Sequence, residues 1–273
     1  LFFLKQKKMQ NKIAIIGAGN LGISLAKGLV ESGVYKPNQF NLSRRRIKKL
    51  QDLQSLGYNV FNNNTDAIHD ADVIVIAVLP QKINEILEEL KATIKPNKLI
   101  ISLVSGVEID EISTQLINEV PIVRAMPNTA IAIRESMTCI ATKNKWKDKL
   151  EIVKDMFDHV GETAVIIEEK MTSATALCAC GIAFFLRAIR AASQGGNEID
   201  FHAPEALKMA AQTAKGAASL LLKNNTHPED EIDKVTSPKG CTIAGLNEME
   251  HNGFSSAFIK GITVSADKAK NLY

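Results

Sequence analysis

The chain has 273 residues, of which 45% are hydrophobic and 23% charged, and its formal net charge is only +3. This composition is typical of a soluble globular protein with one large domain or two ordinary ones, and the even mixture of acids and bases argues against a nucleic-acid partner. Four cysteines and five scattered histidines form neither a disulfide framework nor a cluster with metal-ligand spacing, which favours a reducing, cytoplasmic setting.

Neither a secretory signal nor a membrane span is expected. The first ten residues place an apolar run of four before a group of lysines, which is the reverse of the order in a signal peptide. Met9 is therefore the expected start of the protein, with residues 1–8 a leader. The longest uncharged run, residues 171–186, is shorter than the ~20 residues that span a bilayer, so it is expected to be a buried helix.

Short apolar runs alternate with amphipathic stretches up to residue 168. Runs typical of strands cover residues 12–17, 39–43, 58–61, 72–78, 99–104, 121–126, 137–142 and 163–167. Helical periodicity is found over residues 23–32, 44–56, 82–94 and 109–117. The runs 72–78 and 99–104 are apolar except for Asp72 and Ser102, as expected of strands covered on both faces. This alternation predicts a doubly wound, Rossmann-type α/β domain over residues 9–168.

The pattern beyond residue 168 is helical only. Residues 171–193 are apolar nearly all round until Arg187, and residues 203–223 carry small side chains at helical spacing. Further helices are predicted over 242–253 and through the end of the chain. Such wide apolar faces on about 105 residues would make a thin core, so this all-helical domain, residues 169–273, is expected to pack against another subunit.

The sequence GAGNLG follows the first predicted strand and opens a helix. That context favours a dinucleotide-binding turn, and a plain glycine turn is the alternative. Gly17 would permit the tight turn, Gly19 would let a pyrophosphate approach the backbone, and Gly22 would allow close packing of helix on strand. The start of the helix, with Asn20 and Leu21 between the glycines, offers free N–H groups to the phosphates.

The end of the second predicted strand distinguishes NADP from NAD. An acidic residue there would bind the ribose 2′-hydroxyl of NAD. This chain has Ser43, Arg44, Arg45 and Arg46 instead, with no acid. Arginine suits a 2′-phosphate, so NADPH is the favoured cofactor and NADH the second choice. A basic first turn of a surface helix is the alternative reading.

The stretch TSPKGCTIAG, residues 236–245, interrupts the helical half of the chain. Proline, two glycines and several hydroxyl or thiol side chains at this spacing end one helix and begin the next. By its residues alone the stretch is either a turn and nothing more, or a loop whose donors serve a ligand.

Seven segments together resemble the pyrroline-5-carboxylate reductases in order and spacing. They are GAGNLG, SRR, ADVIVIAVLPQ, ISLVSGV, VRAMPNTA, QTAKGAA and TSPKGCTIAGL. The resemblance covers essentially the whole chain from Met9. It implies reduction of the cyclic imine 1-pyrroline-5-carboxylate to L-proline with NAD(P)H. It also implies a helical domain that interlocks in a homodimer, often with five dimers in a ring.

The resemblance assigns roles to individual residues of the cofactor site. Asn64 is expected near the adenosine ribose and its phosphate. The remaining residues line the cofactor path or lie beside the nicotinamide: Ala77, Val78, Pro80, Met126, Pro127, Asn128 and Thr129.

The resemblance also makes TSPKGCTIAG the substrate loop. Ser237 and the main-chain amides of Cys241 and Thr242 would hold the substrate carboxylate. Gly240 would let the backbone turn so that successive N–H groups face one anion. The Thr242 hydroxyl would lie near the imine nitrogen, which makes Thr242 the expected catalytic residue.

Three departures from the family pattern leave the grip on the cofactor and the shape of the substrate pocket open. Leu79 stands where many members have lysine, residues 178–184 read CACGIAF in place of SGSGPAY, and Lys239 occupies a glycine-type position. Two other functions also remain. One is a reductase of another small imine or of a hydroxy acid, with Lys170 as its acid, and the other is a regulator that binds NADPH without catalysis.

Overall fold

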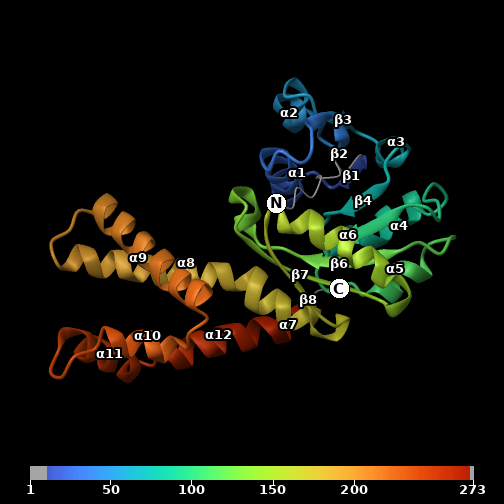
Figure 1. The fold of residues 1–273 in the computed structure, drawn as a ribbon. Helices are drawn as coiled ribbons and strands as arrows, with labels where there is room; N and C mark the ends of the chain where they lie inside the picture. The colour runs from blue at the N-terminus through green and yellow to red at the C-terminus, as the bar shows by residue number, and fades with distance from the viewer. Residues whose placement is uncertain (1–10, 271–273) are drawn as a thin grey trace, which may run out of the picture. The chain divides into compact units, whose positions relative to one another are not determined.

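The structure is a computed structural model that describes residues 11–270. The expected start at Met9, the leader before it, and Tyr273 at the end of the last expected helix lie outside the described residues. The chain divides into two compact units. The larger unit runs up to Cys180 and takes in the chain from Ser265 onward, and the smaller unit is Gly181–Val264 (Figure 1).

An eight-stranded sheet forms the centre of the larger unit, in the order β3-β2-β1-β4-β5-β6-β7-β8 (Figure 1). Neighbouring strands are parallel except β6 and β7, which are antiparallel. The strands are β1 (Ile13–Ile16), β2 (Phe40–Ser43), β3 (Asn59–Phe61), β4 (Val73–Ile76), β5 (Leu99–Ser102), β6 (Ile122–Met126), β7 (Ser136–Thr142) and β8 (Gly161–Val165). The predicted doubly wound fold is confirmed, and its order reverses between β1 and β4, where such sheets open a ligand crevice.

Helices cover both faces of the sheet because successive side chains of a strand point to opposite sides. Ile13 and Ile15 of β1 belong to one apolar cluster, and Ala14 and Ile16 belong to another. The first cluster includes α1 (Asn20–Glu31) and α6 (Lys147–Asp158), and the second includes α3 (Asn64–Ile68), α4 (Ile83–Leu90) and α5 (Ile109–Thr114). Every residue of β4 and β5 is buried, as predicted for strands covered on both faces.

The basic segment after β2 is less helical than predicted. A 3-10 turn, η2 (Ile47–Leu50), leads into the short helix α2 (Gln51–Ser55), so the prediction of one helix over residues 44–56 is wrong at its start. The cause is strand pairing, since the Arg44 N–H donates to the Phe61 carbonyl at 3.1 Å and keeps the chain extended past β2. The arginines therefore leave the strand edge without joining a helix.

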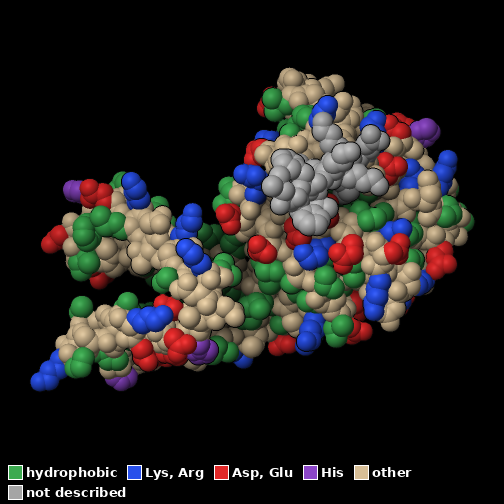
Figure 2. Space-filling model, viewed as in Figure 1, with side chains coloured by type: hydrophobic (Ala, Val, Ile, Leu, Met, Phe, Trp, Pro, Cys, Tyr) green, Lys and Arg blue, Asp and Glu red, His purple; other side chains and the backbone are tan. Residues whose placement is uncertain are grey.

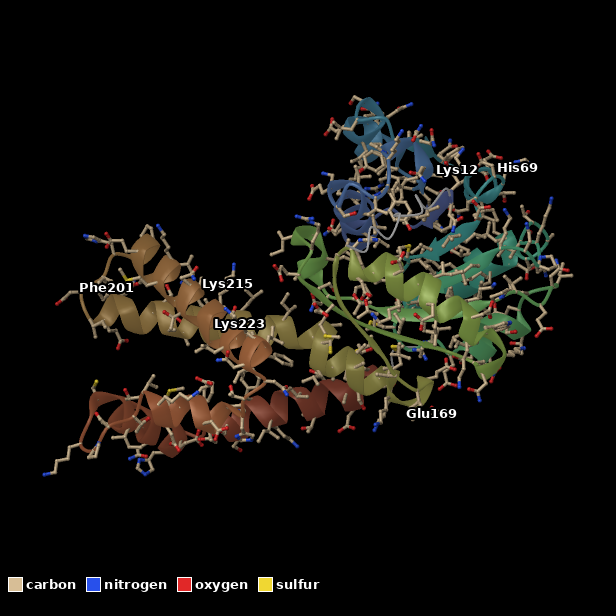
Figure 3. The ribbon with its side chains drawn as sticks, in the orientation of Figure 1. Lys12, His69, Glu169, Phe201, Lys215 and Lys223 are labelled. Atoms are coloured by element: carbon tan, nitrogen blue, oxygen red, sulfur yellow. The ribbon has the colours of Figure 1, made fainter. Side chains whose placement is uncertain are left out.

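The short helix α3 is anchored at its C-terminal end by a buried ammonium group. Lys98 is only 6% exposed and donates to the carbonyls of Ile68 at 3.0 Å, His69 at 3.2 Å and Ala71 at 2.6 Å. Burial lowers the pKa of Lys98. His69 lies at the end of α3 (Figure 3). Five residues are too few for a stable isolated helix, so these bonds help to fix Asn64 at its first turn.

The smaller unit consists of helices. They are α8 (Gly181–Glu198), α9 (Ala203–Asn224), α10 (Pro228–Lys234), α11 (Cys241–His251) and α12 (Phe254–Ala269), of which the last turns of α12 belong to the larger unit. Helix α10 was not predicted from the sequence. Its signals are Pro228 in the first turn with three acidic residues, Glu229, Asp230 and Glu231, which suit a helix N-terminus.

Large apolar side chains of the smaller unit are exposed in a single copy. Phe184, Phe185 and Phe254 surround Phe258, with ring centroids 5.4 to 6.3 Å apart. Nevertheless Phe185 is 58% exposed and Leu222 is 84% exposed. The prediction that the first long helix is buried on most sides is therefore wrong for one copy, because the unit has too few residues to cover its own apolar faces.

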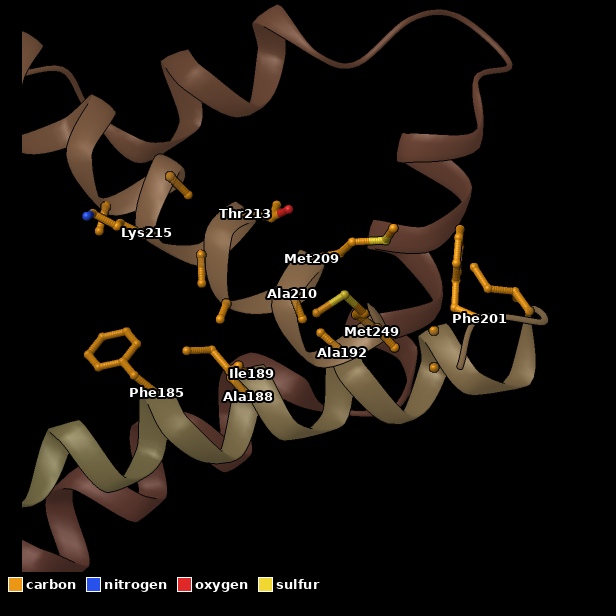
Figure 4. Close-up of a pocket in the computed structure, with 18 of the residues that line it drawn as sticks. Phe185, Ala188, Ile189, Ala192, Phe201, Met209, Ala210, Thr213, Lys215 and Met249 are labelled. Atoms are coloured by element: carbon orange, nitrogen blue, oxygen red, sulfur yellow. The ribbon is translucent and has the colours of Figure 1, made fainter. Parts of the chain in front are cut away.

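An apolar groove of about 1000 Å³ lies within the smaller unit, along α8 and α9 (Figure 4). Phe185 and Ile189 of α8, Met209 of α9 and Met249 of α11 line it. Much of the rest of its lining is alanine or glycine, which lets the two helices lie close together, and the groove is open to solvent.

One helical run in the described part of the chain, Glu168–Glu198, is long and apolar enough to cross a membrane by length and composition. It exceeds the uncharged stretch seen in the sequence because the helix continues through Arg187 and Arg190. Only 22% of its most apolar window is buried within one copy. A helix that contacts another protein chain can have the same length and apolarity, so these two properties do not distinguish lipid from protein as its neighbour.

Candidate active site

The loop after β1 has two positions that only glycine fits. Gly17 has a φ of +87°, and a Cβ there would lie 2.6 Å from the Ala77 carbonyl oxygen. A Cβ on Gly22 would lie 2.8 Å from the Ile15 side chain. The first glycine therefore makes the tight turn, and the second lets α1 lie directly against β1.

Gly19 differs from Gly17 and Gly22 because the space beside it is open. A Cβ there would approach no atom closer than 3.8 Å. Gly19 is the N-cap of α1, no side chain caps this helix end, and the first turn contains no acid. The N–H groups of Asn20, Leu21 and Gly22 therefore have no partner inside the helix, and an uncapped helix start with open space beside Gly19 fits a dinucleotide pyrophosphate.

Polar side chains gather where β2 and β3 end. The Ser43 hydroxyl donates to Asn64 Oδ1 at 2.6 Å, and Asn64 Nδ2 donates to Glu89 at 2.8 Å. Arg44 Nη1 donates to the Ala18 carbonyl at 3.2 Å, so its guanidinium lies beside the glycine loop. The structure brings these three predicted cofactor residues, Ser43, Arg44 and Asn64, to one edge of the sheet.

Two carboxylates of α4 at the same edge were not predicted from the sequence. Glu89 holds Asn64, and Glu85 forms an ion pair with the exposed Arg45. A hydrogen bond from Lys82, together with the Arg45 charge, lowers the pKa of Glu85. The signal was available, since a helix that follows β4 begins at the edge where β2 ends.

The segment after β4 lies against the glycine loop. The Ala77 N–H donates to the Ile16 carbonyl at 2.8 Å, and Val78 would contact any side chain at Gly17. Leu79, one of the three departures noted from the sequence, is 70% exposed and brings no charge to this surface. Pro80 opens a 3-10 turn, η3 (Pro80–Lys82).

The loop after β6 is held by its own asparagine. Met126 ends β6, and Pro127 follows it. The Asn128 N–H donates to Ser136 Oγ at 3.1 Å, and its side-chain oxygen accepts from the Ala130 N–H at 3.0 Å. Asn128 Nδ2 donates to the Cys178 carbonyl at 3.3 Å, which joins this loop to the helix entered at residue 171. Ser136 and Cys178 were not predicted as partners of Asn128, because neither is near it in the sequence pattern.

The charges of the larger unit are mixed. Figure 2 shows acidic and basic side chains interspersed over the face in view, without a large patch of one sign. Across residues 11–270, no three His, Cys, Asp or Glu side chains are grouped so that they could hold a metal ion.

The predicted substrate loop, which belongs to the smaller unit, begins with a tight turn. The Gly240 N–H donates to the Ser237 carbonyl at 2.9 Å, and the turn has Pro238 at its second position. Lys239, at the third position, has a φ of 59°, as in a type II turn that favours glycine there. A Cβ on Gly240 would lie 2.9 Å from the Ser237 carbonyl oxygen and closer still to its hydroxyl.

The turn leads directly into the uncapped N-terminus of α11. Gly240 is the N-cap, no side chain caps this end, and the first turn contains no acid. The N–H groups of Cys241, Thr242 and Ile243 therefore have no partner inside the helix, and the Thr242 side chain is partly exposed. Such a helix end suits a small carboxylate.

Comparison with known proteins gives two family matches. Residues 168–272 match the model described as pyrroline-5-carboxylate reductase dimerisation, and residues 12–106 match the model described as NADP oxidoreductase coenzyme F420-dependent. Two relatives from Dictyostelium discoideum are named pyrroline-5-carboxylate reductase 1 and 2. They are 52% and 50% identical to this chain over 98% and 96% of its length. The chain spans about half of the first relative (51%) and 93% of the second.

A solved structure agrees with the family match. Plasmodium falciparum pyrroline carboxylate reductase, determined with NADP bound, superposes with a TM-score of 0.88 and 25% sequence identity. The match covers 96% of this chain and 98% of that one. The similarity therefore extends over both the sheet and the helices that follow it.

Proposed function

Since the chain belongs to the pyrroline-5-carboxylate reductase family, we propose that it reduces 1-pyrroline-5-carboxylate to L-proline with NADPH. The observation that carries this function is the helix end at Cys241, which has free N–H groups, no capping side chain and no nearby acid in its first turn. An amino-acid-like ring with one carboxylate is the kind of ligand that such an end holds.

The larger unit would hold NADPH, which supplies a hydride from the nicotinamide C4 when bound. The N–H groups around Gly19 would take the pyrophosphate. Ser43, Arg44 and Arg45 would take the 2′-phosphate, because guanidinium groups bind phosphate and the strand end has no acid that would prefer a hydroxyl. Met126, Pro127 and Asn128 would lie beside the nicotinamide.

Replacing Arg44 and Arg45 together with alanine is expected to raise the KM for NADPH about thirtyfold and to change the KM for NADH little. The reason is that NADH lacks the 2′-phosphate that these side chains would contact. Initial rates of cofactor oxidation with each cofactor measure the two constants.

The matched control is Glu85→Gln, which removes the carboxylate that pairs with Arg45. Freed from this partner, Arg45 is expected to lower the KM for NADPH by a few-fold, without the same gain for NADH. Equal changes for both cofactors in the double variant would remove the assignment of Arg44 and Arg45.

The smaller unit would orient the substrate for the transfer. Ser237 and the N–H groups of Cys241 and Thr242 would hold its carboxylate, while the Thr242 hydroxyl would hydrogen bond to the ring nitrogen. A protonated imine is already an electrophile, so this chemistry requires orientation and hydrogen bonds more than a strong acid.

Thr242→Ala is expected to lower turnover by about tenfold or more, because the ring nitrogen loses its partner. Thr242→Ser, which keeps the hydroxyl, is expected to recover most of the rate. Steady-state kinetics of both variants at saturating NADPH test this role. Wild-type turnover in the alanine variant would rule it out.

The absorbance of NADPH tests the function as a whole. Oxidation is expected with 1-pyrroline-5-carboxylate and not with larger imines, 2-keto acids or 3-keto acids. Activity on a keto acid alone would support a hydroxy acid reductase, for which Lys170, exposed before α7 (Met171–Ala174), is the candidate acid. Binding of NADPH with no turnover of any of these compounds would support a regulator.

We also propose a homodimer formed through the helical domain, residues 169–273, with residues 9–168 as the dinucleotide-binding domain. The exposed apolar groove and the dimerisation family match support this assembly. The same surfaces account for the apolar run Glu168–Glu198 without a bilayer, in a soluble, cytoplasmic enzyme. Five dimers in a ring follow from the family resemblance alone, and a light-scattering mass distinguishes the dimer from that decamer.

A further inference from the structure

Two of the free cysteines in the described part of the chain lie next to each other, although they are far apart in sequence. Cys139 is on β7, and Cys178 is in the π-helical turn η7 (Thr175–Cys180) that precedes α8. Their Sγ atoms are 3.9 Å apart, within hydrogen-bond distance for sulfur. Both residues belong to the larger unit, so the pair does not depend on any second chain or on the smaller unit.

The two thiols differ in access and in acidity. Cys139 is only 5% exposed, whereas Cys178 is partly exposed. The hydrogen bond from Cys139 lowers the pKa of Cys178 to about 7, although burial acts in the opposite direction. The same hydrogen bond, with burial, raises the pKa of Cys139. Cys178 is therefore the more reactive thiolate, and Cys139 is a protonated neighbour sheltered from solvent.

Cys178 lies in the π-helical turn, and its Sγ is 3.9 Å from that of Cys139. A disulfide needs an S–S distance of about 2.05 Å, so the two atoms must approach by roughly 2 Å. A π-helical turn within a longer helix is uncommon and is frequent at functional sites. The turn also contacts the loop after β6, since the Cys178 carbonyl accepts from Asn128.

We propose that Cys139 and Cys178 form a reversible disulfide when a peroxide reaches Cys178. The Cys178 thiolate attacks one oxygen of hydrogen peroxide, the O–O bond breaks, and the products are Cys178 sulfenic acid and, after protonation, water. Cys139 then attacks the Cys178 sulfur, the S–O bond breaks, and a second water leaves with the Cys139 proton. The peroxide is reduced to two waters, and the two thiols are oxidised to one disulfide.

Peptide mapping of the oxidised full-length protein tests the proposal. The protein is treated with hydrogen peroxide, its remaining thiols are blocked with N-ethylmaleimide, and it is digested without reductant. A linked pair of peptides containing Cys139 and Cys178 is expected, about 2 Da lighter than the two reduced peptides together, and lost after treatment with dithiothreitol. Cys180 and the exposed Cys241 serve as internal controls and are expected to remain outside the link.

Two variants sharpen the result. In Cys139→Ser, which keeps a hydrogen-bond donor beside Cys178, Cys178 is expected to stop at sulfenic or higher acids, and in Cys178→Ser, the buried Cys139 is expected to stay reduced. A link from Cys178 to Cys180, to Cys241 or to a second chain in the wild-type protein would overturn the proposal, as would protection of Cys178 from peroxide. The mass readout is independent of the proposed reductase activity, so failure of either proposal leaves the other intact.

Discussion

Gly17→Ala is expected to lower the free energy of unfolding of the larger unit by about 3 kcal/mol and to abolish NADPH binding. The left-handed backbone at Gly17 disfavours a side chain, and the new Cβ would lie 2.6 Å from the Ala77 carbonyl oxygen. That oxygen is main chain at the end of β4, so relief requires movement of the strand or of the glycine loop. Denaturant unfolding and cofactor titration measure the two effects.

Gly33→Ala is the matched control for this prediction. Gly33 has a similar φ of +81°, but a Cβ there meets no atom within 4 Å. Its substitution should cost only the backbone preference, about 1 kcal/mol, and leave cofactor binding unchanged. If both variants lost the same stability and both still bound NADPH, the close approach of β1 and β4 would not be what requires glycine at position 17.

Gly240→Ala is expected to raise the KM for the imine substrate about a hundredfold with little change in the KM for NADPH. The new methyl group would overlap the Ser237 carbonyl oxygen and hydroxyl, so the turn that precedes α11 must open. The N–H groups at the start of the helix would then no longer face one anion together. Initial rates with each substrate varied in turn separate the two constants.

Gly245→Ala, one turn further along α11, controls for a change in the helix itself. A Cβ at Gly245 meets nothing within 4 Å, and alanine favours a helix interior. Wild-type kinetics are expected. A comparable rise of the substrate KM in this variant would show that the turn at Gly240 has no special part in binding.

The strands and the glycine loop could be predicted because their causes are local in sequence. An apolar run such as residues 73–76 is typical of a covered strand, and a glycine at position 17 follows such a strand directly. The conformation of the arginine segment, residues 44–46, was harder to predict. Its extended backbone depends on the hydrogen bond between Arg44 and Phe61, and the periodicity of residues 44–56 contains no information about that contact.

Contacts between distant residues could not be predicted from spacing. Cys139 and Cys178 are 39 positions apart, and they meet because β7 passes beside the π-helical turn. Glu85 reaches Arg45 because two crossover connections bring α4 and the end of β2 to one edge. The extent of burial in the helices could not be predicted either, because periodicity identifies an apolar face but not the surface that packs against it.

The open groove along α8 and α9 makes the stability of the folded protein depend on its concentration. In the proposed homodimer a partner covers Phe185 and Met209, so mass action should raise the melting temperature with protein concentration. In dilute solution the equilibrium moves toward single copies that expose these side chains and unfold more readily. A cell that makes little of this chain would thus retain an even smaller share of it in the folded state.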